Sequence, residues 1–360
     1  MCNVAGYTGI KRAAPVLIDM IRREQFFDGG RSTGIVTVHE GKLYCAKVVG
    51  DVDVLLKETD AWNFPGTCGI IHSRPSGNLP SCAHPFLDET GRFAIVQNNT
   101  LRGVGTPEFY AQFNATAQKY YDRGALTSAH QPEKAGLLRV LSDGNTYSDS
   151  EVYALMIGEE LAKLGATPEN AAQAMASGFS ALPCDGVILS VHADLPGLIT
   201  AGVTTRPLSA LTFGQETFLA TTPFAFPEYT SNSRSIIEVP VASVSQALPG
   251  AFTVTGLAIP DTRIEAPSTR ALALAYERIV SILKGQKDDP KCLYDFPIYA
   301  EWRDLWDTPP VECKFEKDGD LLKPTARLAY SALWSLHLEG RLRRRLGEYK
   351  NRTIERFWID

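Results

Sequence analysis

The residue with the clearest chemical potential is Cys2, which directly follows the initiator methionine. Removal of Met1 is favoured because the next side chain is small, and the mature chain would then carry a thiol and a free α-amine on one residue. Reference pKa values are about 8 for such an amine and about 8.5 for a thiol. The amine can therefore act as general base for the thiol beside it, and we expect a self-activated nucleophile at Cys2.

Four further segments give this cysteine a context. The first segment is the opening Met1-Cys2-Asn3-Val4-Ala5-Gly6. The four further segments are Gly69-Ile70-Ile71-His72-Ser73-Arg74, Ala83-His84-Pro85, Ile95-Val96-Gln97-Asn98-Asn99 and Ser148-Asp149-Ser150-Glu151-Val152. In order and spacing they resemble the class II, N-terminal-nucleophile glutamine amidotransferases, above all the glutaminase domain of glucosamine-6-phosphate synthase. The resemblance covers roughly the first 250 residues. One such segment would be weak evidence, whereas five in register are strong.

The resemblance implies a reaction in which Cys2 attacks the side-chain amide of glutamine, forms a γ-glutamyl thioester and releases ammonia. Asn98 matches the residue whose side-chain amide stabilises the oxyanion, and such a donor is typically worth about 10²–10³ in rate. Asn99 stands where the family has glycine, but only its backbone N–H is required there. Without the resemblance, Asn98-Asn99 would be interpreted as an ordinary turn pair.

Substrate capture is implied for two charged residues. Arg74 matches the arginine that pairs with the α-carboxylate of glutamine, a task that suits its planar guanidinium. Asp149 matches the carboxylate that holds the α-ammonium. The alternatives are structural: Arg74 in a surface ion pair, and Asp149 as a helix N-cap.

The loop after Arg74 departs from the family. Relatives usually continue Arg-Trp-Ala-Thr-His-Gly, whereas this chain has Pro75-Ser76-Gly77-Asn78 and lacks the aromatic, threonine and histidine that close over glutamine. Ser76 is the candidate substrate contact in this loop. Asn3 and Arg31 are further departures expected near the pocket, since the family has glycine and, close to the second position, aspartate. These changes leave substrate identity more open than fold.

Three functions are therefore consistent with these motifs. The first is a glutamine-hydrolysing amidotransferase domain whose ammonia goes to an unknown acceptor, in the C-terminal segment or a partner chain. The second is a stand-alone amidohydrolase of the same design that acts on another γ-glutamyl or amino-acid amide. The third is a non-catalytic binding or regulatory module of the same fold. Joint retention of Cys2, Arg74, Asn98 and Asp149 argues against the third.

Histidine and cysteine usage points to no metal and no cofactor. His72 is interpreted as a packed or hydrogen-bonded strand residue rather than a proton carrier, and His84 before Pro85 as a turn residue. The seven cysteines are scattered and form no CxxC pair, so they indicate neither a zinc site nor a disulfide framework. We expect reduced thiols in a cytoplasmic protein.

The elements that must position these residues follow from hydrophobic periodicity. Helices are predicted over 14–23, over 52–62, over 151–164 with its start at Asp149 or Ser150, and from Pro168 with Thr167 as its N-cap. Strands are predicted over 33–38, 43–46, 69–72, 93–96, 187–192, 197–203, 215–221 and 234–239, with a hairpin turn at Glu40-Gly41. This α+β order agrees with the four-layer αββα N-terminal-nucleophile hydrolase sandwich that the resemblance implies.

The composition changes near residue 250, which divides the chain into an amidotransferase domain over 1–250 and a mostly helical extension of unknown role over 251–360. In the extension, Ser268 is expected to cap a helix whose face carries Leu272, Tyr276, Ile279 and Leu283. A later helix should begin at Pro324 and present Ala329, Leu333 and Leu336. The basic cluster 341–345 also fits a helical pattern.

The net charge and the hydropathy of the chain limit the classes of partner that we expect. The formal net charge is −5, and no apolar run approaches the roughly 18 residues of a membrane helix. Neither nucleic acid nor a membrane is an expected partner, and the N-terminus lacks the layout of a secretory leader. The expected partners are a small-molecule substrate (glutamine or a related amide), an acceptor domain or partner chain, and a second copy of the chain if it forms a homo-oligomer.

Overall fold

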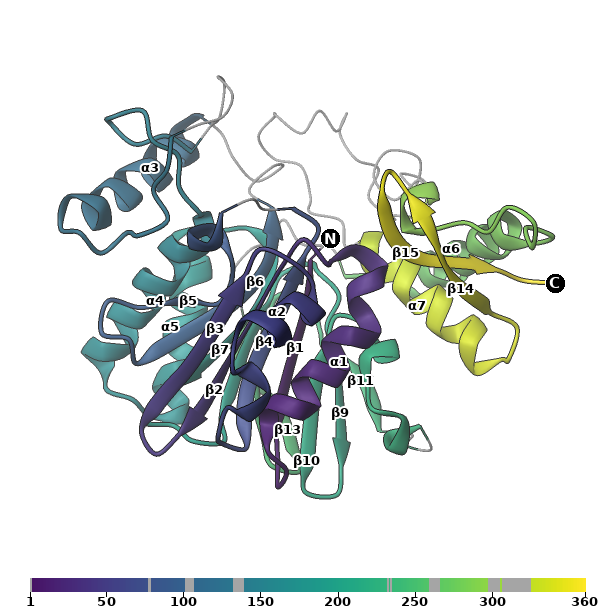
Figure 1. Cartoon of the computed structure of the whole chain (residues 1–360), viewed down its shortest axis with the longest axis horizontal. Coiled ribbons are helices and arrows are strands. Elements are labelled where there is room, and N and C mark those ends of the chain that lie inside the picture. Colours follow the sequence, from purple (N-terminus) through teal and green to yellow (C-terminus); the bar gives the residue numbers. More distant parts are fainter. Residues whose placement is uncertain are drawn as a thin grey trace.

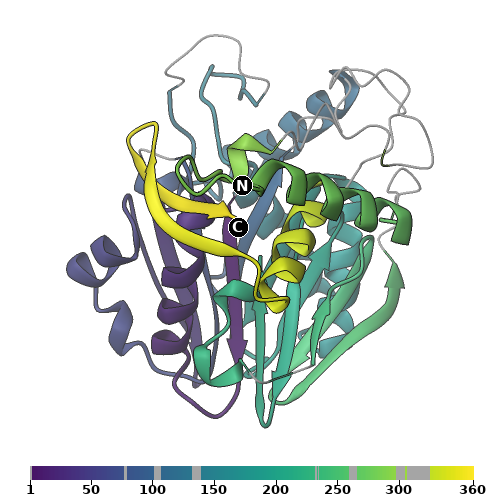
Figure 2. The same cartoon turned by 90° about the vertical axis from the view of Figure 1, so that its right-hand side faces the viewer.

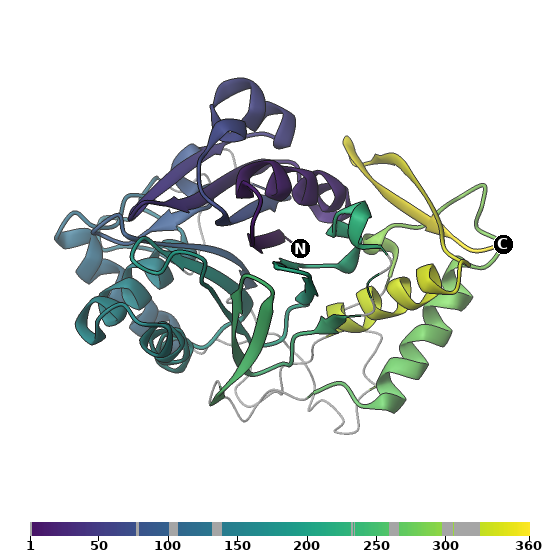
Figure 3. The ribbon, with the colours of Figure 1, turned by 90° about the horizontal axis from the view of Figure 1, so that it is seen from below.

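The computed structural model describes most of the chain. The described residues are 2–76, 79–100, 107–131, 139–231, 233, 235–258, 266–296, 305 and 325–360. Two antiparallel sheets lie face to face, helices cover their outer faces, and a C-terminal extension lies at one side (Figure 1). Figure 3, seen from below, shows the sheets between the two helical layers. The predicted αββα sandwich is confirmed.

The first sheet carries the N-terminal strand in its interior. Its spatial order is β11 (Ile236–Glu238), β9 (Ser209–Phe213), β10 (Glu216–Ala220), β1 (Asn3–Thr8), β4 (Cys68–Arg74), β2 (Ser32–His39) and β3 (Lys42–Val48). Helices α1 (Ala13–Asp28) and α2 (Val52–Glu58) cover its outer face. Glu40 and Gly41 both have positive φ, so the predicted hairpin turn between β2 and β3 is confirmed.

The second sheet carries the strand that holds Asn98. Its order is β13 (Ala251–Ala258), β12 (Ser243–Leu248), β8 (Ile199–Val203), β7 (Asp185–His192), β6 (Phe93–Thr100) and β5 (Phe86–Leu87). Helices α4 (Asp149–Leu164) and α5 (Pro168–Ala181) cover it, and α3 (Pro107–Asp122) packs on α4. Thr167 Oγ1 accepts the N–H of Asn170 at 3.2 Å, which confirms the predicted N-cap.

The two sheets meet in a layer of buried, mostly aliphatic side chains. Its fully buried members come from strands of both sheets and include Val4, Val36, Ile70, Val96, Leu189, Ile199 and Leu219. Because side chains alternate along a strand, the same strands also bury their other face against the helices. Burial on both faces fixes the register of β1 and β6, and therefore fixes where their ends lie.

The extension has a hydrophobic core that also includes residues of the sandwich. It contains α6 (Thr269–Leu283), α7 (Thr325–Leu338) and the hairpin of β14 (Arg343–Tyr349) and β15 (Arg352–Trp358), which lies beside α1 (Figure 2). Phe27 of α1 packs against Phe224, Tyr330 and Phe357, with ring centroids 5.4, 6.0 and 5.5 Å away. Five short 3₁₀ segments are Ala61–Asn63, Pro80–Cys82, Pro223–Ala225, Glu228–Thr230 and Leu293–Asp295.

Two partly buried ion pairs tie the extension to the sandwich. Arg352 Nη2 lies 2.9 Å from Asp28 Oδ1 at the end of α1, and Arg327 Nε lies 2.8 Å from Glu238 Oε1 of β11. Removing one member of such a pair would leave a charge poorly solvated. The extension is therefore an integral part of the fold.

Three expectations about the extension need correction. The boundary at residue 250 is wrong, because it divides the hairpin of β12 and β13 and the sheet continues to Ala258. The extension is less helical than predicted, because residues 343–358 form a β-hairpin. The basic cluster accordingly lies mainly in β14, and the positive-φ pair Lys350-Asn351 closes the turn.

The two extension helices agree better with expectation. Ser268 Oγ accepts the N–H of Ala271 at 3.1 Å and caps α6 as predicted. Ile279 and Leu283 are buried on α6, but Leu272 is 36% exposed because the buried stripe also runs through Ala271 and Ala275. Ala329, Leu333 and Leu336 are buried on α7 as predicted. Pro324 lies outside the described residues.

Several elements have no counterpart in the sequence expectations, namely α3, β9, β12 and β13. Among the described residues, no helix combines the length and apolar character needed to cross a bilayer.

Candidate active site

The register of β1 decides what Cys2 faces. Asn3 pairs with Ser73 and Val4 with His72, so Cys2 lies one residue before the first pair of the ladder, at the end of β4 that carries Arg74. Side chains alternate along the chain, and Cys2 therefore points, like Val4, toward the space between the sheets. Asn3 points the other way, and its Nδ2 donates to the carbonyl of Glu24 in α1 at 2.8 Å. The expectation that Asn3 alters the pocket is wrong for this reason.

Asn98 of β6 faces Cys2 across the inter-sheet space. The backbone N of Cys2, which becomes the α-amine if Met1 is removed, donates to Asn98 Oδ1 at 3.3 Å. This bond assigns the carboxamide orientation. Asn98 is 2% exposed, and its Nδ2 has no hydrogen-bond partner among the described residues. A buried orphan donor costs about 1–3 kcal/mol, and this one belongs to the carboxamide that contacts Cys2.

The backbone N–H of Asn99 lies on the β5 edge of β6. The Phe93 carbonyl accepts from Asp88 on the β5 side of β6 (2.9 Å), and the Arg92 carbonyl accepts from Ala193 on the β7 side (2.8 Å). Backbone groups alternate between the two edges, so the N–H of Asn99 lies on the same edge as that of Phe93. Because β5 has only two residues, no described strand covers this edge at Asn99.

Burial sets the state of the Cys2 thiol. It raises the pKa of Cys2, the charges of Arg74 and Arg206 lower it, and that of Asp149 raises it. These groups thus lie close enough to act on the sulfur. A thiol with a raised pKa is protonated at neutral pH, so its reactivity requires a nearby base.

Arg74 is half-exposed at the end of β4 and held by main chain. Its Nη1 donates to the carbonyl of Cys82 at 2.8 Å, and its Nη2 lies 3.4 Å from Ser76 Oγ. Among the described residues it has no carboxylate partner, so the surface ion-pair alternative is not observed. Ser76 is exposed beside the guanidinium. Arg74 is therefore available to a ligand carboxylate next to Cys2.

Asp149 is the first residue of α4. The N-cap position belongs to Ser148, so the N-cap alternative for Asp149 is wrong. The Asp149 side chain is mostly buried, and its Oδ1 accepts the N–H of Ser150 at 3.0 Å. The same oxygen lies 2.7 Å from Nη1 of Arg139, whose side chain is 37% exposed. The carboxylate expected to read a substrate ammonium is thus already paired with a cation.

Sequence reasoning missed Arg139 and Arg206. Arg206 is 6% exposed, and its Nη2 lies 2.8 Å from Asp185 Oδ2 at the start of β7. Its position in the polar run Thr204-Thr205-Arg206, just after the predicted strand 197–203, was the available signal. Arg139 lies in no motif, and only folding brings it to Asp149.

His72 and His84 form a buried pair of rings that are tilted relative to each other. Their ring centroids are 4.0 Å apart, and among the described residues no well-formed hydrogen bond reaches any of the four ring nitrogens. Burial lowers the pKa of His72 to about 3 and that of His84 well below its ordinary value. The interpretation of His72 as a packed strand residue is confirmed, and His84 precedes a cis-proline just before β5.

This pair predicts acid sensitivity. Below a pH of about 6.5 the unfolded chain protonates His72, whereas the folded chain does not do so until about pH 3. The free energy of unfolding should therefore fall as pH falls through this window, by about 1.4 kcal/mol per pH unit for each proton. His72→Leu should make the slope shallower by about that amount between roughly pH 6 and pH 4, as measured by urea unfolding. Slopes that coincide for the variant and the wild type would refute this assignment.

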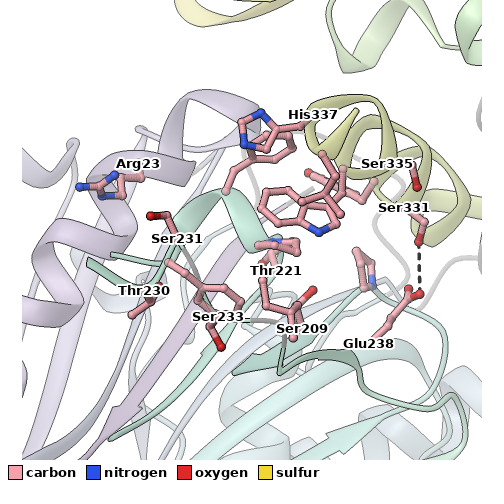
Figure 4. Close-up of a pocket in the computed structure, with 18 of the residues that line it drawn as sticks. Arg23, Ser209, Thr221, Thr230, Ser231, Ser233, Glu238, Ser331, Ser335 and His337 are labelled. Atoms are coloured by element: carbon pink, nitrogen blue, oxygen red, sulfur yellow. Dashed lines mark hydrogen bonds between the residues drawn. The ribbon is translucent and has the colours of Figure 1, made fainter. Parts of the chain in front are cut away.

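A cavity of about 820 Å³ lies between the sandwich and the extension (Figure 4). Its walls come from α1, β9, residues 221–231, β11, α7 and β14. Hydroxyl groups dominate its polar lining, and Glu238 joins Ser331 of α7 across it at 3.2 Å. Thr221 Oγ1 at its edge accepts the N–H of Val4 at 2.8 Å. The extension therefore closes a cavity linked to β1, two residues from Cys2.

The described residues hold no cluster of three or more metal-ligating side chains. The six described cysteines are all free thiols, and Cys313 lies outside the described residues.

Comparison with known proteins places this geometry in context. No protein-family profile matches the chain. A protein named glutamine–fructose-6-phosphate aminotransferase (isomerizing) from Leifsonia xyli subsp. xyli is 26% identical over 270 residues, covering 74% of this chain and 38% of that protein. The protein of the same name from Pyrococcus horikoshii is 35% identical over 104 residues, covering 28% and 17%. The chain thus spans less than two fifths of these curated relatives.

Solved structures agree on the fold. The glutamine phosphoribosylpyrophosphate amidotransferase of B. subtilis aligns with a TM-score of 0.52 and 17% identity over 71% of this chain and 49% of its own. A structure described as the allosteric regulatory enzyme of purine biosynthesis aligns with a TM-score of 0.53 and 15% identity over 77% and 58%. Sequence relatives and fold neighbours agree: this chain is similar to the class II glutamine amidotransferases and has their fold.

Proposed function

We propose that this chain hydrolyses the side-chain amide of glutamine through Cys2 and releases ammonia for an acceptor that is still unknown. The observation that carries the proposal is the pairing of Cys2 with Asn98. One end of the carboxamide accepts from the nitrogen beside the thiol, and the other end is a buried donor with no described partner. This arrangement supplies a nucleophile, a base and an oxyanion donor in one place.

In the first half-reaction, Cys2 Sγ attacks the amide carbon while its own α-amine takes the thiol proton. A C–S bond forms, and the carbonyl oxygen gains negative charge near Asn98 Nδ2 and the Asn99 N–H. Preorganised donors in a water-poor site stabilise such charge strongly. As the C–N bond breaks, the α-ammonium returns the proton to the leaving nitrogen, which departs as ammonia.

In the second half-reaction, water attacks the thioester. The α-amine accepts a proton from this water, the C–S bond breaks, and the thiol recovers its proton as glutamate leaves. Asn98 Oδ1 holds the α-amine through the contact of 3.3 Å and so keeps its lone pair directed at Sγ. This positioning matters because the raised pKa of Cys2 leaves little thiolate without a base.

Substrate binding is assigned to Arg74 and Asp149, with Ser76 as an additional contact. The Arg74 guanidinium is anchored by one nitrogen on Cys82, which leaves its remaining donors for the substrate carboxylate. Two parallel N–H···O bonds from one guanidinium give both affinity and orientation. Asp149 lies within electrostatic reach of the same thiol, on the side of α4.

The ammonia acceptor separates two versions of this function. The curated relatives are aminotransferases more than twice as long as the matched region, so the acceptor chemistry of this protein would lie in its own extension or in another chain. The altered loop 75–78 favours the second version, a stand-alone amidohydrolase acting on a related amide. Both versions require the same Cys2 chemistry.

The test is intact mass spectrometry before and after incubation with 6-diazo-5-oxo-norleucine, a glutamine analogue that alkylates a nucleophilic thiol. We expect loss of Met1 and addition of one analogue, because Cys2 would attack the electrophile as it attacks the amide. Peptide mapping should place the adduct on Cys2.

The Cys2→Ala protein is the control and should gain no mass. A processed chain that ignores the analogue but hydrolyses another amide would favour the stand-alone version. Retained Met1 together with no adduct and no amide hydrolysis would refute the proposal and favour a non-catalytic module.

A further inference from the structure

The contact of interest is the ion pair between Arg139 and Asp149. Its atoms are 2.7 Å apart, and the Asp149 side chain is 13% exposed against 37% for that of Arg139. Charge-assisted bonds of this length to a mostly buried carboxylate are among the stronger polar contacts. A substrate ammonium that approached Asp149 would have to share the carboxylate with this guanidinium or displace it.

The fold fixes where Arg139 lies. Its neighbour Val140 forms a bridge with Thr146, and the Val140 N–H donates to Asn114 Oδ1 of α3 at 3.3 Å. The same Asn114 oxygen accepts the Tyr147 hydroxyl at 2.6 Å. Arg139 thus begins a small hairpin that is anchored on α3 and leads directly into Asp149. The ion pair therefore joins two ends of one folded unit.

The charges around Cys2 reinforce this effect. Arg206 pairs with Asp185 and Arg139 pairs with Asp149, so the carboxylate that acts on the thiol already has a guanidinium beside it. Arg74 has no carboxylate partner among the described residues. The balance of charge around Cys2 therefore attracts a substrate carboxylate and offers little additional stabilisation to a substrate ammonium.

We propose that Arg139 is a specificity-determining residue that relaxes the requirement for a free α-ammonium, so that this site accepts ω-amides bearing a carboxylate with or without that group. The inference rests on the proposed function, because it concerns the same thioester chemistry at Cys2. Arg139 would act by competing for Asp149, and Arg74 would remain the group that recognises the carboxylate.

The test compares glutamine with glutaramate, which is glutamine without its α-amino group. The quantity measured is the ratio of kcat/KM for the two amides, since it is unaffected by loss of folded enzyme. We expect a ratio within about tenfold of unity for the wild type, and at least about a tenfold shift toward glutamine in Arg139→Ala. Asp149→Asn introduced into Arg139→Ala should remove that shift, because the freed carboxylate causes it.

Arg123→Ala is the matched control. Arg123 is 36% exposed and also pairs with carboxylates, those of Glu89 at 2.7 Å and Glu159 at 3.3 Å. Its removal should leave the ratio unchanged. A wild type that prefers glutamine by more than about a hundredfold, or an Arg139→Ala ratio equal to the wild-type ratio, would overturn the inference.

Failure of the proposed function would look different. In that case neither amide would be hydrolysed and Cys2 would stay unmodified by 6-diazo-5-oxo-norleucine. If the inference alone fails, glutamine hydrolysis and the adduct remain and only the dependence on Arg139 is absent.

Discussion

Replacing Cys2 by alanine should lower the rate of glutamine hydrolysis by a factor on the order of 10⁴ or more, because it removes the thiol that we assign to form the thioester. Alanine is also small, so removal of Met1 should continue and the α-amine should still be present. The measurement is ammonia release at saturating glutamine, together with the melting temperature of each protein.

The matched control is Cys45→Ala, which removes a half-buried thiol on β3, the edge strand that β4 and β2 separate from β1. It should retain wild-type turnover. Substantial ammonia release by Cys2→Ala, with the protein folded and Met1 removed, would show that another residue is the nucleophile.

Replacing Asn98 by alanine has the second largest expected effect. It removes the donor Nδ2 and also the acceptor Oδ1, which holds the nitrogen beside the thiol at 3.3 Å. Loss of one oxyanion donor typically lowers kcat by about 10²–10³, and KM should change much less because the charge develops only in the transition state. The melting temperature should fall much less than the loss in kcat would suggest, because the variant also removes a buried donor without a described partner.

Asn99→Ala separates side chain from backbone at the neighbouring position. Our assignment uses only the N–H of Asn99, which alanine retains, so its kcat should stay within a few-fold of the wild type. Equal losses in the two variants would contradict the assignment, as would a change confined to KM in Asn98→Ala.

Much of the sandwich could be predicted from local patterns. Strands such as 33–38 and 187–192 are short apolar runs bounded by turn residues, and Thr167-Pro168 is a strong helix start, so the correct elements followed from period and capping alone. Prediction failed where tertiary contacts override local preference. The arginine-rich stretch in β14 suits a helix by propensity, but a positive-φ turn and packing of β15 on α1 make it a strand.

The candidate site divides in the same way. Cys2, Asn98, Arg74 and Asp149 were predicted together from motifs, and the fold brings them within reach of one thiol. Their catalytic and binding roles stay predictions. Arg139 and Arg206 were missed because neither has a pattern of its own, and each acquires its place only through an ion pair with a residue distant in sequence or in another element.

The sequence by itself determined which chemistry is predicted, since a second-position cysteine and ordered motifs depend on residue identity and spacing alone. Only the tertiary structure decided which groups surround the predicted site residues. It directs Asn3 toward α1 and away from the Cys2 site, leaves the Asn99 N–H on a strand edge that no described strand covers, and places Arg139 on Asp149. The physical reason is that strand parity, edge exposure and ion pairing depend on which elements pack together, and that information is not contained in any local stretch of residues.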